Sequence, residues 1–359
     1  MTYDVLIVGG GLSALAVADA LHRAGHGFTL LEARQRVGGR VLTQSTRSAD
    51  YDLGPAWIWP HNRRMRSLAE RFGLDLFEQH ATGNLVFEDA GGAIRRDLAF
   101  ATMGGALRIA GGLGKITSGL AANLPPETLR LAHRVHNLAA EPDKIKVTGT
   151  APSGEFELHA DQVVLALPPR IAAASLSFSP ALDPMIRDRL ARVPTWMAGQ
   201  AKLVAVYDRP FWRDGGLSGD AISHHGPLVE IHDASPADAV EGGLFGFLAP
   251  GRKGDAEAMK DAALAQLARL FGPDAGAPRD VLIKDWSKDP ETATNDDKAD
   301  VPGHPTYQPI PPLSGDWRGR VSFAGTETAR NEGGFLEGAL EAAGTSVAAI
   351  EYASEGTVP

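Results

Sequence analysis

The chain has 359 residues, including 41 glycines and no cysteine, and a formal net charge of −9. Without cysteine it cannot form disulfides, thiolate metal sites, iron–sulfur clusters or a sulfur-tethered cofactor. The hydrophobic fraction of 43% excludes intrinsic disorder, and the acidic balance argues against nucleic acid or an anionic membrane as a partner. The length predicts two domains, or one large α/β unit with an inserted part.

The N-terminal segment predicts a β-α-β unit. Residues 3–8 are an apolar run, residues 12–24 show helical spacing, and residues 28–31 form a second apolar run. A crossover of this length implies parallel strands. Because we find neither a signal peptide nor an apolar run of about 18 residues, we expect a cytoplasmic protein without a membrane span.

The rest of the chain predicts short strands interspersed with helices. Helices are expected over residues 63–72, 255–271 and 334–352, where apolar residues recur with helical spacing. Residues 287–319 are polar and rich in proline, which predicts a loop. The expected strands are residues 84–88, 93–97, 145–150, 155–159, 163–167, 200–207, 244–249, 281–286 and 321–324.

A glycine-rich turn between the first strand and the first helix predicts a dinucleotide site. In Gly9-x-Gly11-x-x-Ala14, the first glycine permits a tight turn, the second lets the backbone approach a pyrophosphate, and the alanine allows close packing. The helix N-terminus attracts phosphates. Glu32, at the end of the second strand, would accept hydrogen bonds from ribose hydroxyls and disfavours NADP. The alternative is a glycine-rich turn followed by an exposed glutamate.

A second glycine pair lies just beyond this acid. Gly38 and Gly39 would let the chain run alongside an extended cofactor, and Arg40 would supply a fixed cation. Simple nicotinamide enzymes do not need this second pair. The pattern therefore favours FAD over NAD.

With these motifs in place, the sequence resembles the FAD-dependent amine oxidase family, which includes monoamine oxidases, polyamine oxidases and L-amino-acid oxidases. The matching segments follow the family order from end to end of the chain. They are residues 5–43, DLGPAW at 52–57, ADxVVLALP at 160–168, Lys202 with DRPFW at 208–212, DWSxDP at 285–290, and FAGTET at 323–328 leading to GFLEGA at 334–339.

The resemblance implies an α/β fold with two domains. A Rossmann-like FAD-binding domain, with a parallel sheet built on the β-α-β unit, would carry an inserted, sheet-floored α+β substrate domain. The resemblance assigns residues 1–77, 104–191 and 289–359 to the FAD-binding domain, and residues 78–103 and 192–288 to the substrate domain.

Family members are usually longer than this chain, and the shortfall lies between Phe77 and Gly104. Relatives carry much of a helical substrate lid there. We expect a short β-hairpin over residues 78–103 instead, and hence a more open or differently covered site.

The resemblance also implies that FAD is bound noncovalently, because the cysteine that links the flavin in some relatives is absent. Gly325 and Glu327 match a segment that binds the ribityl and phosphate portion. The helix that Gly334 opens would point its N-terminus at the flavin, unless this is a simple helix start. The implied cofactor-binding residues are Gly9, Gly11, Ala14, Glu32, Ala33, Arg34, Gly39, Arg40, Gly54, Pro55, Ala56, Trp57, Val135, Ala166, Gly325, Glu327, Gly334 and Phe335.

Lys202 is the first candidate catalytic residue. It lies in an apolar strand, where a buried lysine is costly unless it is paired or functional. In the family the matching lysine holds a water at flavin N5 and aids reoxidation by O₂; the alternative is an edge-strand lysine that points to solvent. Trp286 matches a family tryptophan that packs beside the flavin. The alternative interpretation is that Trp286 is an ordinary aromatic residue of the core.

The family's substrate cage pairs two aromatic side chains. Phe335 occupies the second position, whereas the first falls at Asn295-Asp296, where neither residue is aromatic. Tyr307 is our candidate replacement, with His304 as another. The alternative is that both are loop residues without a role, which would put an arylalkylamine substrate in doubt.

Two clusters invite a metal hypothesis that the sequence does not favour. His224, His225 and His232 have no cysteine or clustered carboxylates to complete a site. The pair Asp296-Asp297 is interpreted as a solvated loop rather than a calcium site. We therefore expect no metal.

The resemblance implies an enzyme that transfers hydride from a carbon bearing an amine to flavin N5. The small-molecule substrate would be an amine, and O₂ would accept the electrons from the reduced flavin to give H₂O₂. The imine product would then hydrolyse. One alternative is another flavin reaction on this fold, such as a desaturase, a porphyrinogen-type oxidase or an NAD(P)H-dependent reductase. A second is a flavin-binding partner without oxidase activity.

Overall fold

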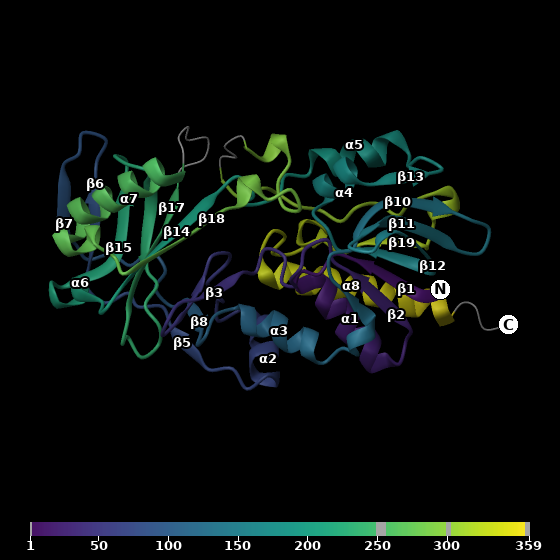
Figure 1. Ribbon diagram of the computed structural model, residues 1–359, viewed down its shortest axis with the longest axis horizontal. Coiled ribbons are helices and arrows are strands. Elements are labelled where there is room, and N and C mark those ends of the chain that lie inside the picture. The colour runs from purple at the N-terminus through teal and green to yellow at the C-terminus, as the bar shows by residue number, and fades with distance from the viewer. Residues whose placement is uncertain (1, 249–255, 299–302, 356–359) are drawn as a thin grey trace.

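The computed structural model describes residues 2–248, 256–298 and 303–355, and its strands form two large sheets (Figure 1). The first sheet has the order β13-β10-β11-β12-β1-β2-β9, with β19 beside β12. In chain order its strands are β1 (Thr2–Val8), β2 (Phe28–Leu31), β9 (Leu129–Arg130), β10 (Arg134–Ala140), β11 (Ile145–Ala151), β12 (Gly154–Leu165), β13 (Ser177–Ser179) and β19 (Val321–Phe323).

The centre of the first sheet is parallel and buried on both faces. Strand β1 pairs in parallel with β2 and β12, which confirms the predicted β-α-β unit. The helices α1 (Leu12–Ala24), α2 (Arg63–Arg71), α3 (Gly114–Ala122) and α8 (Leu336–Glu355) pack on one face, with Leu15, Ile116 and Leu340 in a shared core. The helices α4 (Pro169–Ser175) and α5 (Pro184–Arg192) cover the other face.

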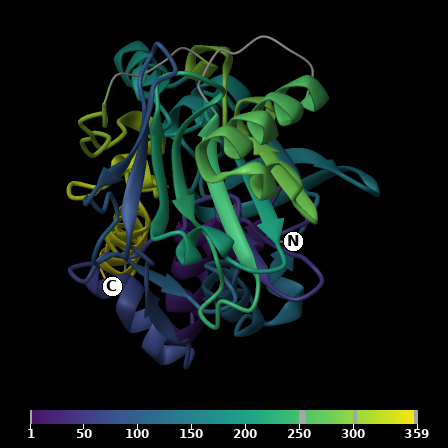
Figure 2. The ribbon, with the colours of Figure 1, turned by 90° about the vertical axis from the view of Figure 1, so that its left-hand side faces the viewer.

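The second sheet has the order β18-β14-β17-β16-β15-β6-β7 (Figure 2). Alternation along β14 sends Leu203 and Ala205 into a core with helix α7 (Ala256–Phe271), and Val204 and Val206 toward Leu53 on the opposite face. The strands are β6 (Asn84–Glu88), β7 (Ile94–Leu98), β14 (Ala201–Tyr207), β15 (Leu217–Ser223), β16 (Leu228–Asp233), β17 (Gly242–Leu248) and β18 (Asp280–Asp285), with α6 (Phe211–Asp214) near β15.

Smaller elements complete the fold. These are the strand pairs β3 (Thr43–Ser45) with β4 (Asp50–Asp52) and β5 (Leu76–Glu78) with β8 (Leu107–Ile109), and short 3₁₀ helices at Pro126–Thr128, Pro273–Gly276, Trp286–Lys288, Asn295–Lys298, Gly315–Trp317 and Thr326–Thr328.

The hairpin predicted in place of a lid is confirmed. Strands β6 and β7 pair antiparallel, and β6 also pairs in parallel with β15, so the hairpin extends the second sheet. Strands β10, β15 and β16 and helices α3, α4 and α5 were not predicted. In β15 and β16 the buried residues include Asp220 and His232, which obscure the apolar pattern.

The final helix begins at Leu336 and not at Gly334, because Gly334 adopts a positive φ of 85°. The described parts of the segment 287–319, residues 287–298 and 303–319, form a loop as predicted, broken by short 3₁₀ turns. The start of the predicted helix 255–271 and the end of the predicted strand 244–249 lie outside the described residues. No described helix is long and apolar enough to cross a membrane.

Candidate active site

A cavity of about 820 Å³ lies between the two sheets. This volume is in the range of cofactor and ligand sites. Its wall brings together residues that are far apart in the sequence. The predicted site residues on the wall are Gly9, Gly11, Glu32, Arg34, Gly39, Arg40, Gly54, Pro55, Ala56, Trp57, Ala166, Lys202, Trp286, Gly325, Gly334 and Phe335.

The glycines let several backbone segments meet at one end of this cavity. Gly9 has a φ of +112°, and a Cβ there would lie 2.7 Å from the carbonyl oxygen of Ala166. A Cβ on Gly54 would lie 2.0 Å from the carbonyl oxygen of Arg40. Helix α1 begins after Gly11 with no side-chain cap, so its first amides remain free for an anion in the cavity.

Glu32 is held in place by backbone amides. Its carboxylate accepts hydrogen bonds from Gly10 N at 2.6 Å and Arg34 N at 2.7 Å, and the residue is buried. The interpretation as an exposed glutamate after a glycine-rich turn is therefore wrong. At the end of β2, the carboxylate lies where the ribose of a dinucleotide is bound in this type of fold.

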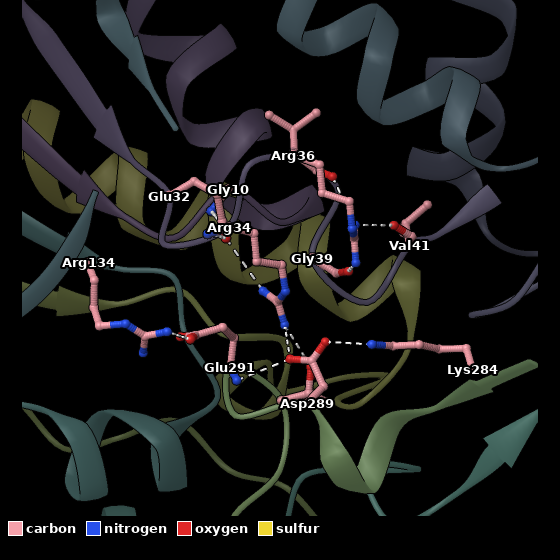
Figure 3. A network of polar contacts seen from close by, with 12 residues as sticks. Gly10, Glu32, Arg34, Arg36, Gly39, Val41, Arg134, Lys284, Asp289 and Glu291 are labelled. Carbon is pink, nitrogen blue, oxygen red and sulfur yellow. Dashed lines mark hydrogen bonds and ion pairs between the residues drawn. The ribbon is translucent and has the colours of Figure 1, made fainter. Parts of the chain in front are cut away.

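Arg34 joins this site to the loop after Trp286 (Figure 3). Its Nη2 donates to Asp289 Oδ1 at 2.5 Å, and Lys284 Nζ donates to the other oxygen of Asp289 at 2.8 Å. Burial favours the neutral carboxyl, but the two cations outweigh it and lower the pKa of Asp289. The loop is thereby fixed across the cavity wall at Glu291 and Thr292.

Arg40 forms an ion pair with a fully buried carboxylate. Its Nη1 lies 2.6 Å from Glu327 Oε1, and Glu327 has an exposed fraction of 0%. Burial lowers the pKa of Arg40, but Glu327 outweighs it and raises the pKa. Neither oxygen of Glu327 accepts an aligned hydrogen bond from the described residues. Such a carboxylate, behind the cavity wall, suits a ligand that offers hydroxyl or amide donors.

Lys202 is buried on the cavity wall. Its exposed fraction is 3%, its Nζ donates to the carbonyl oxygen of Gly54 at 3.1 Å, and the Nζ lies 3.8 Å above the ring of Phe245. Strand β14 is interior, between β17 and β18, so the alternative of a solvent-facing edge lysine is wrong. Burial lowers the pKa of Lys202 to about 7, against the opposing effect of Asp52.

Trp286 lies on the wall near this lysine's strand. Its Nε1 donates to the carbonyl oxygen of Leu53 at 2.9 Å, and the Nζ of Lys284 lies 4.7 Å from the ring. The ring is buried against the cavity rather than in one of the two sheet cores. The structure thus places the Trp286 ring on the cavity wall.

The predicted aromatic pair takes a different form. Phe335 lines the cavity, but the ring of His304 stacks directly on it. The ring centroids lie 4.5 Å apart and the ring planes differ by 5°, which leaves no space for a substrate between the rings. Tyr307 packs against Gly333, donates its hydroxyl to Pro194, and is absent from the wall. The placement of Tyr307 as a cage residue is therefore not supported.

Residues that were not predicted line this part of the cavity wall in place of Tyr307. Trp196, Met197 and Gln200 come from the loop before β14, Glu230 comes from β16, and Met103 follows the hairpin. None of these five residues was predicted from the sequence. The only available signal was a tryptophan and a methionine close before the strand that carries Lys202.

Besides Glu327, three implied cofactor residues are not part of the wall. Ala14 is fully buried in the core beneath α1, where its small side chain permits close packing. Val135 lies in the core of the first sheet, on the hydrophobic side of β10. Ala33 is half-buried between Glu32 and Arg34, and its side chain does not reach the cavity.

Asp297 is a buried anchor, so the interpretation of Asp296-Asp297 as a solvated loop is wrong for this residue. Its carboxylate accepts hydrogen bonds from Thr195 N at 3.1 Å and from Thr294, and it forms an ion pair with Arg170. It therefore holds the loop that carries Trp196. No group of three or more His, Asp or Glu side chains suited to a metal occurs within the described residues.

We expect Asp297→Ala to lower the free energy of unfolding by about 2–4 kcal/mol, because it removes the counter-charge of the Arg170 guanidinium and the acceptor of the Thr195 amide. Urea denaturation measures this change. Asp296→Ala is the matched control, since Asp296 is exposed. Equal stabilities of the two variants would contradict the anchoring role.

The family model for flavin-containing amine oxidoreductases matches residues 12–100 and 83–350. The chain therefore belongs to the flavin-containing amine oxidoreductase family and is a flavoprotein oxidoreductase. A Dictyostelium discoideum protein described as "Probable flavin-containing monoamine oxidase A" is 27% identical over 94% of this chain and 95% of its own length. Amine oxidase B from Sus scrofa is 25% identical over 99% of this chain and 87% of its own.

Solved structures share the fold. Putrescine oxidase bound to putrescine superposes with a TM-score of 0.79 at 21% identity, covering 98% of this chain and 99% of its own. Cyclohexylamine oxidase from Brevibacterium oxydans reaches a TM-score of 0.81 at 19% identity with the same coverage. The predicted α/β fold is confirmed. The Dictyostelium alignment spans 448 positions, so that relative has residues without a counterpart here.

Proposed function

We propose that this protein is a FAD-dependent amine oxidase that binds its cofactor noncovalently and uses O₂ as the acceptor. The observation that carries the proposal is Lys202, buried on the wall of the same cavity that the dinucleotide motif opens into. The family supports flavin and an amine substrate. The absence of cysteine supports noncovalent attachment. Residues 78–103 and 192–288 would form the substrate domain, and residues 1–77, 104–191 and 289–359 the FAD-binding domain.

The cavity fits FAD in its chemistry. The free amides at the start of α1 would bind the pyrophosphate, and Glu32 would accept from the ribose. Arg40 would hold the ribityl portion together with its partner Glu327, which lies beside Gly325. Ala14, Ala33 and Val135 would act through packing alone.

Bound FAD would supply the acceptor for a hydride from the carbon that carries nitrogen, and O₂ would recover the cofactor as H₂O₂ forms. The chain's own residues would position the amine. Phe335 and Trp196 offer apolar walls that exclude water from the reacting carbon. Lys202, with a pKa near 7, would hold a water at its Nζ and exchange a proton with it close to neutral pH.

We expect the purified, FAD-loaded protein to release H₂O₂ with at least one primary or secondary amine in a screen of amines and amino acids. Acid precipitation should release all of the flavin from the protein. Rapid anaerobic bleaching by NADH or NADPH would instead support a reductase. No peroxide with any amine, while FAD stays bound, would support a flavin-binding partner without oxidase activity.

A further inference from the structure

Asp52, the last residue of β4, is a buried carboxylate to which the function proposed above assigns no role. It does not line the cavity, but the two residues that follow it do. The carbonyl oxygen of Leu53 accepts from Trp286 Nε1 at 2.9 Å, and that of Gly54 accepts from Lys202 Nζ at 3.1 Å. Asp52 therefore adjoins the backbone that holds both of these side chains.

Within the described residues, every hydrogen bond of the Asp52 carboxylate comes from a donor. The amide nitrogen of Leu113 lies 3.0 Å and 3.1 Å from its two oxygens. Thr43 Oγ1 accepts from Gly114 N at 2.8 Å, so its single proton is free to point at Asp52 Oδ1, which lies 2.5 Å away. Burial raises the pKa of Asp52, and the hydrogen bonds from Thr43 and Leu113 oppose this effect. A position that only accepts hydrogen bonds suits the ionised carboxylate.

Two buried cations feel the charge of this carboxylate. Arg108 of β8 has an exposed fraction of 7%, and its guanidinium donates to the carbonyl oxygens of Ala234 and Ser235. Burial lowers the pKa of Arg108, and Asp52 opposes this effect more than any other carboxylate does. Burial also lowers the pKa of Lys202 to about 7; Asp52 opposes this lowering, and Arg108 adds to it. The charges of Lys202 and Arg108 are therefore coupled through Asp52.

The other groups around Lys202 leave Asp52 as its counter-charge. Strand register places Lys284 of β18 opposite Lys202, but Lys284 Nζ donates to Asp289 at 2.8 Å. On β17, the two rings that face the Nζ of Lys202 belong to neutral phenylalanines, with centroids 3.8 Å and 5.9 Å away. Among the groups that act on the pKa of Lys202, the negative charge is that of Asp52.

The same carboxylate caps helix α3. Leu113 precedes this helix and Gly114 begins it, so the amides that reach Asp52 and Thr43 are the first ones of the helix. An anion at a helix N-terminus is stabilised by the helix dipole. A residue that only caps a helix would contribute to the free energy of unfolding and would leave the titration of Lys202 unchanged.

We propose that Asp52 is a positioning residue for the reaction with O₂: its carboxylate anchors the segment that binds Lys202 and Trp286, and its charge keeps Lys202 partly protonated at neutral pH. The inference rests on the proposed amine oxidase function and deepens it. Formation of H₂O₂ from O₂ takes two electrons, which the reduced flavin would supply, and two protons. A protonated Lys202 would donate one of these protons, regain it from water, and favour the negative charge that develops on oxygen.

The test follows the reaction of the photoreduced, FAD-loaded protein with O₂ between about pH 5.5 and about pH 9. Asp52→Asn keeps an acceptor oxygen for Thr43 and removes the charge, so the midpoint of the rate profile should fall by about one pH unit. The variant should then react about fivefold more slowly than the wild type at pH 7 and within about twofold of it at pH 5.5. Asp50→Asn, on the same strand and away from the cavity wall, is the matched control. An unchanged midpoint in Asp52→Asn would overturn the proposal.

A second variant tests the same coupling with the opposite sign, and it decides the case if Asp52→Asn does not fold. Arg108→Met removes a like charge from the surroundings of Lys202 and leaves Asp52 with one cation fewer to offset. The midpoint of the reaction with O₂ should therefore rise. A midpoint that stays in place or falls would contradict the coupling through Asp52.

A titration that needs no catalysis separates this proposal from the proposed function. The nuclear magnetic resonance signal of the Lys202 Cε, identified by its loss in Lys202→Met, is followed in the oxidised, FAD-loaded protein. It should titrate at a lower pH in Asp52→Asn than in the wild type. If no amine is oxidised, the proposed function fails, but this shift still supports Asp52 as the residue that sets the charge of Lys202. Equal midpoints in the two proteins overturn that role.

Discussion

Replacing Arg40 by methionine is expected to lower the free energy of unfolding by about 2–4 kcal/mol and to weaken the retention of FAD. The physical reason is the position of Glu327, which is fully buried and lies 2.6 Å from the guanidinium. Without Arg40 the carboxylate stays in an apolar site without its counter-charge. Because Arg40 itself is 27% exposed, we place the effect below that of a fully buried pair.

The measurement is urea denaturation of the FAD-saturated protein, with flavin loss followed by ultrafiltration. The double variant Arg40→Met/Glu327→Gln removes the uncompensated charge, so it should recover part of the lost stability. If the double variant lost as much free energy of unfolding as Arg40→Met and Glu327→Gln lose together, the two side chains would not be coupled.

Replacing Lys202 by methionine should slow the reaction of the reduced holoenzyme with O₂ about a hundredfold. The substitution keeps the length of the side chain but removes the buried Nζ that bonds to Gly54. Stopped-flow mixing of the photoreduced protein with O₂ measures the rate. Lys260→Met, on the outside of α7, is the control. Unchanged reoxidation in the Lys202 variant would remove this lysine from the mechanism.

The same substitution should stabilise the protein, by about 2–4 kcal/mol at pH 6. The folded chain lowers the pKa of Lys202 from 10.5 to about 7, so folding is penalised wherever the lysine is charged in the unfolded state. The penalty is complete below pH 7 and is relieved as the pH rises toward 10.5. The stabilisation by methionine should therefore shrink over this range. A difference that grows with pH would contradict a depressed pKa.

Parts of the site that depend on local spacing were predictable. Gly9, Gly11 and Glu32 lie within one β-α-β unit, so the order of strand, turn and helix already places them together. Lys202 stood out because an apolar strand makes a charged residue conspicuous. The prediction for Tyr307 rested on the order of residues in a loop, and nothing in that order reveals that its hydroxyl turns to Pro194.

The sequence by itself determined the glycine-rich turn with Glu32, the buried strand with Lys202 and the hairpin of β6 and β7, since each depends on residues close together in the chain. Only the tertiary structure decided the rest of the cavity wall. Glu230 reaches the wall that carries Lys202 through the pairing of β14, β17 and β16, and Asp297 fixes Trp196 from a loop about a hundred residues away. Strand register and loop closure are long-range contacts, and the free energy that selects them comes from burial in the assembled fold and not from the local sequence.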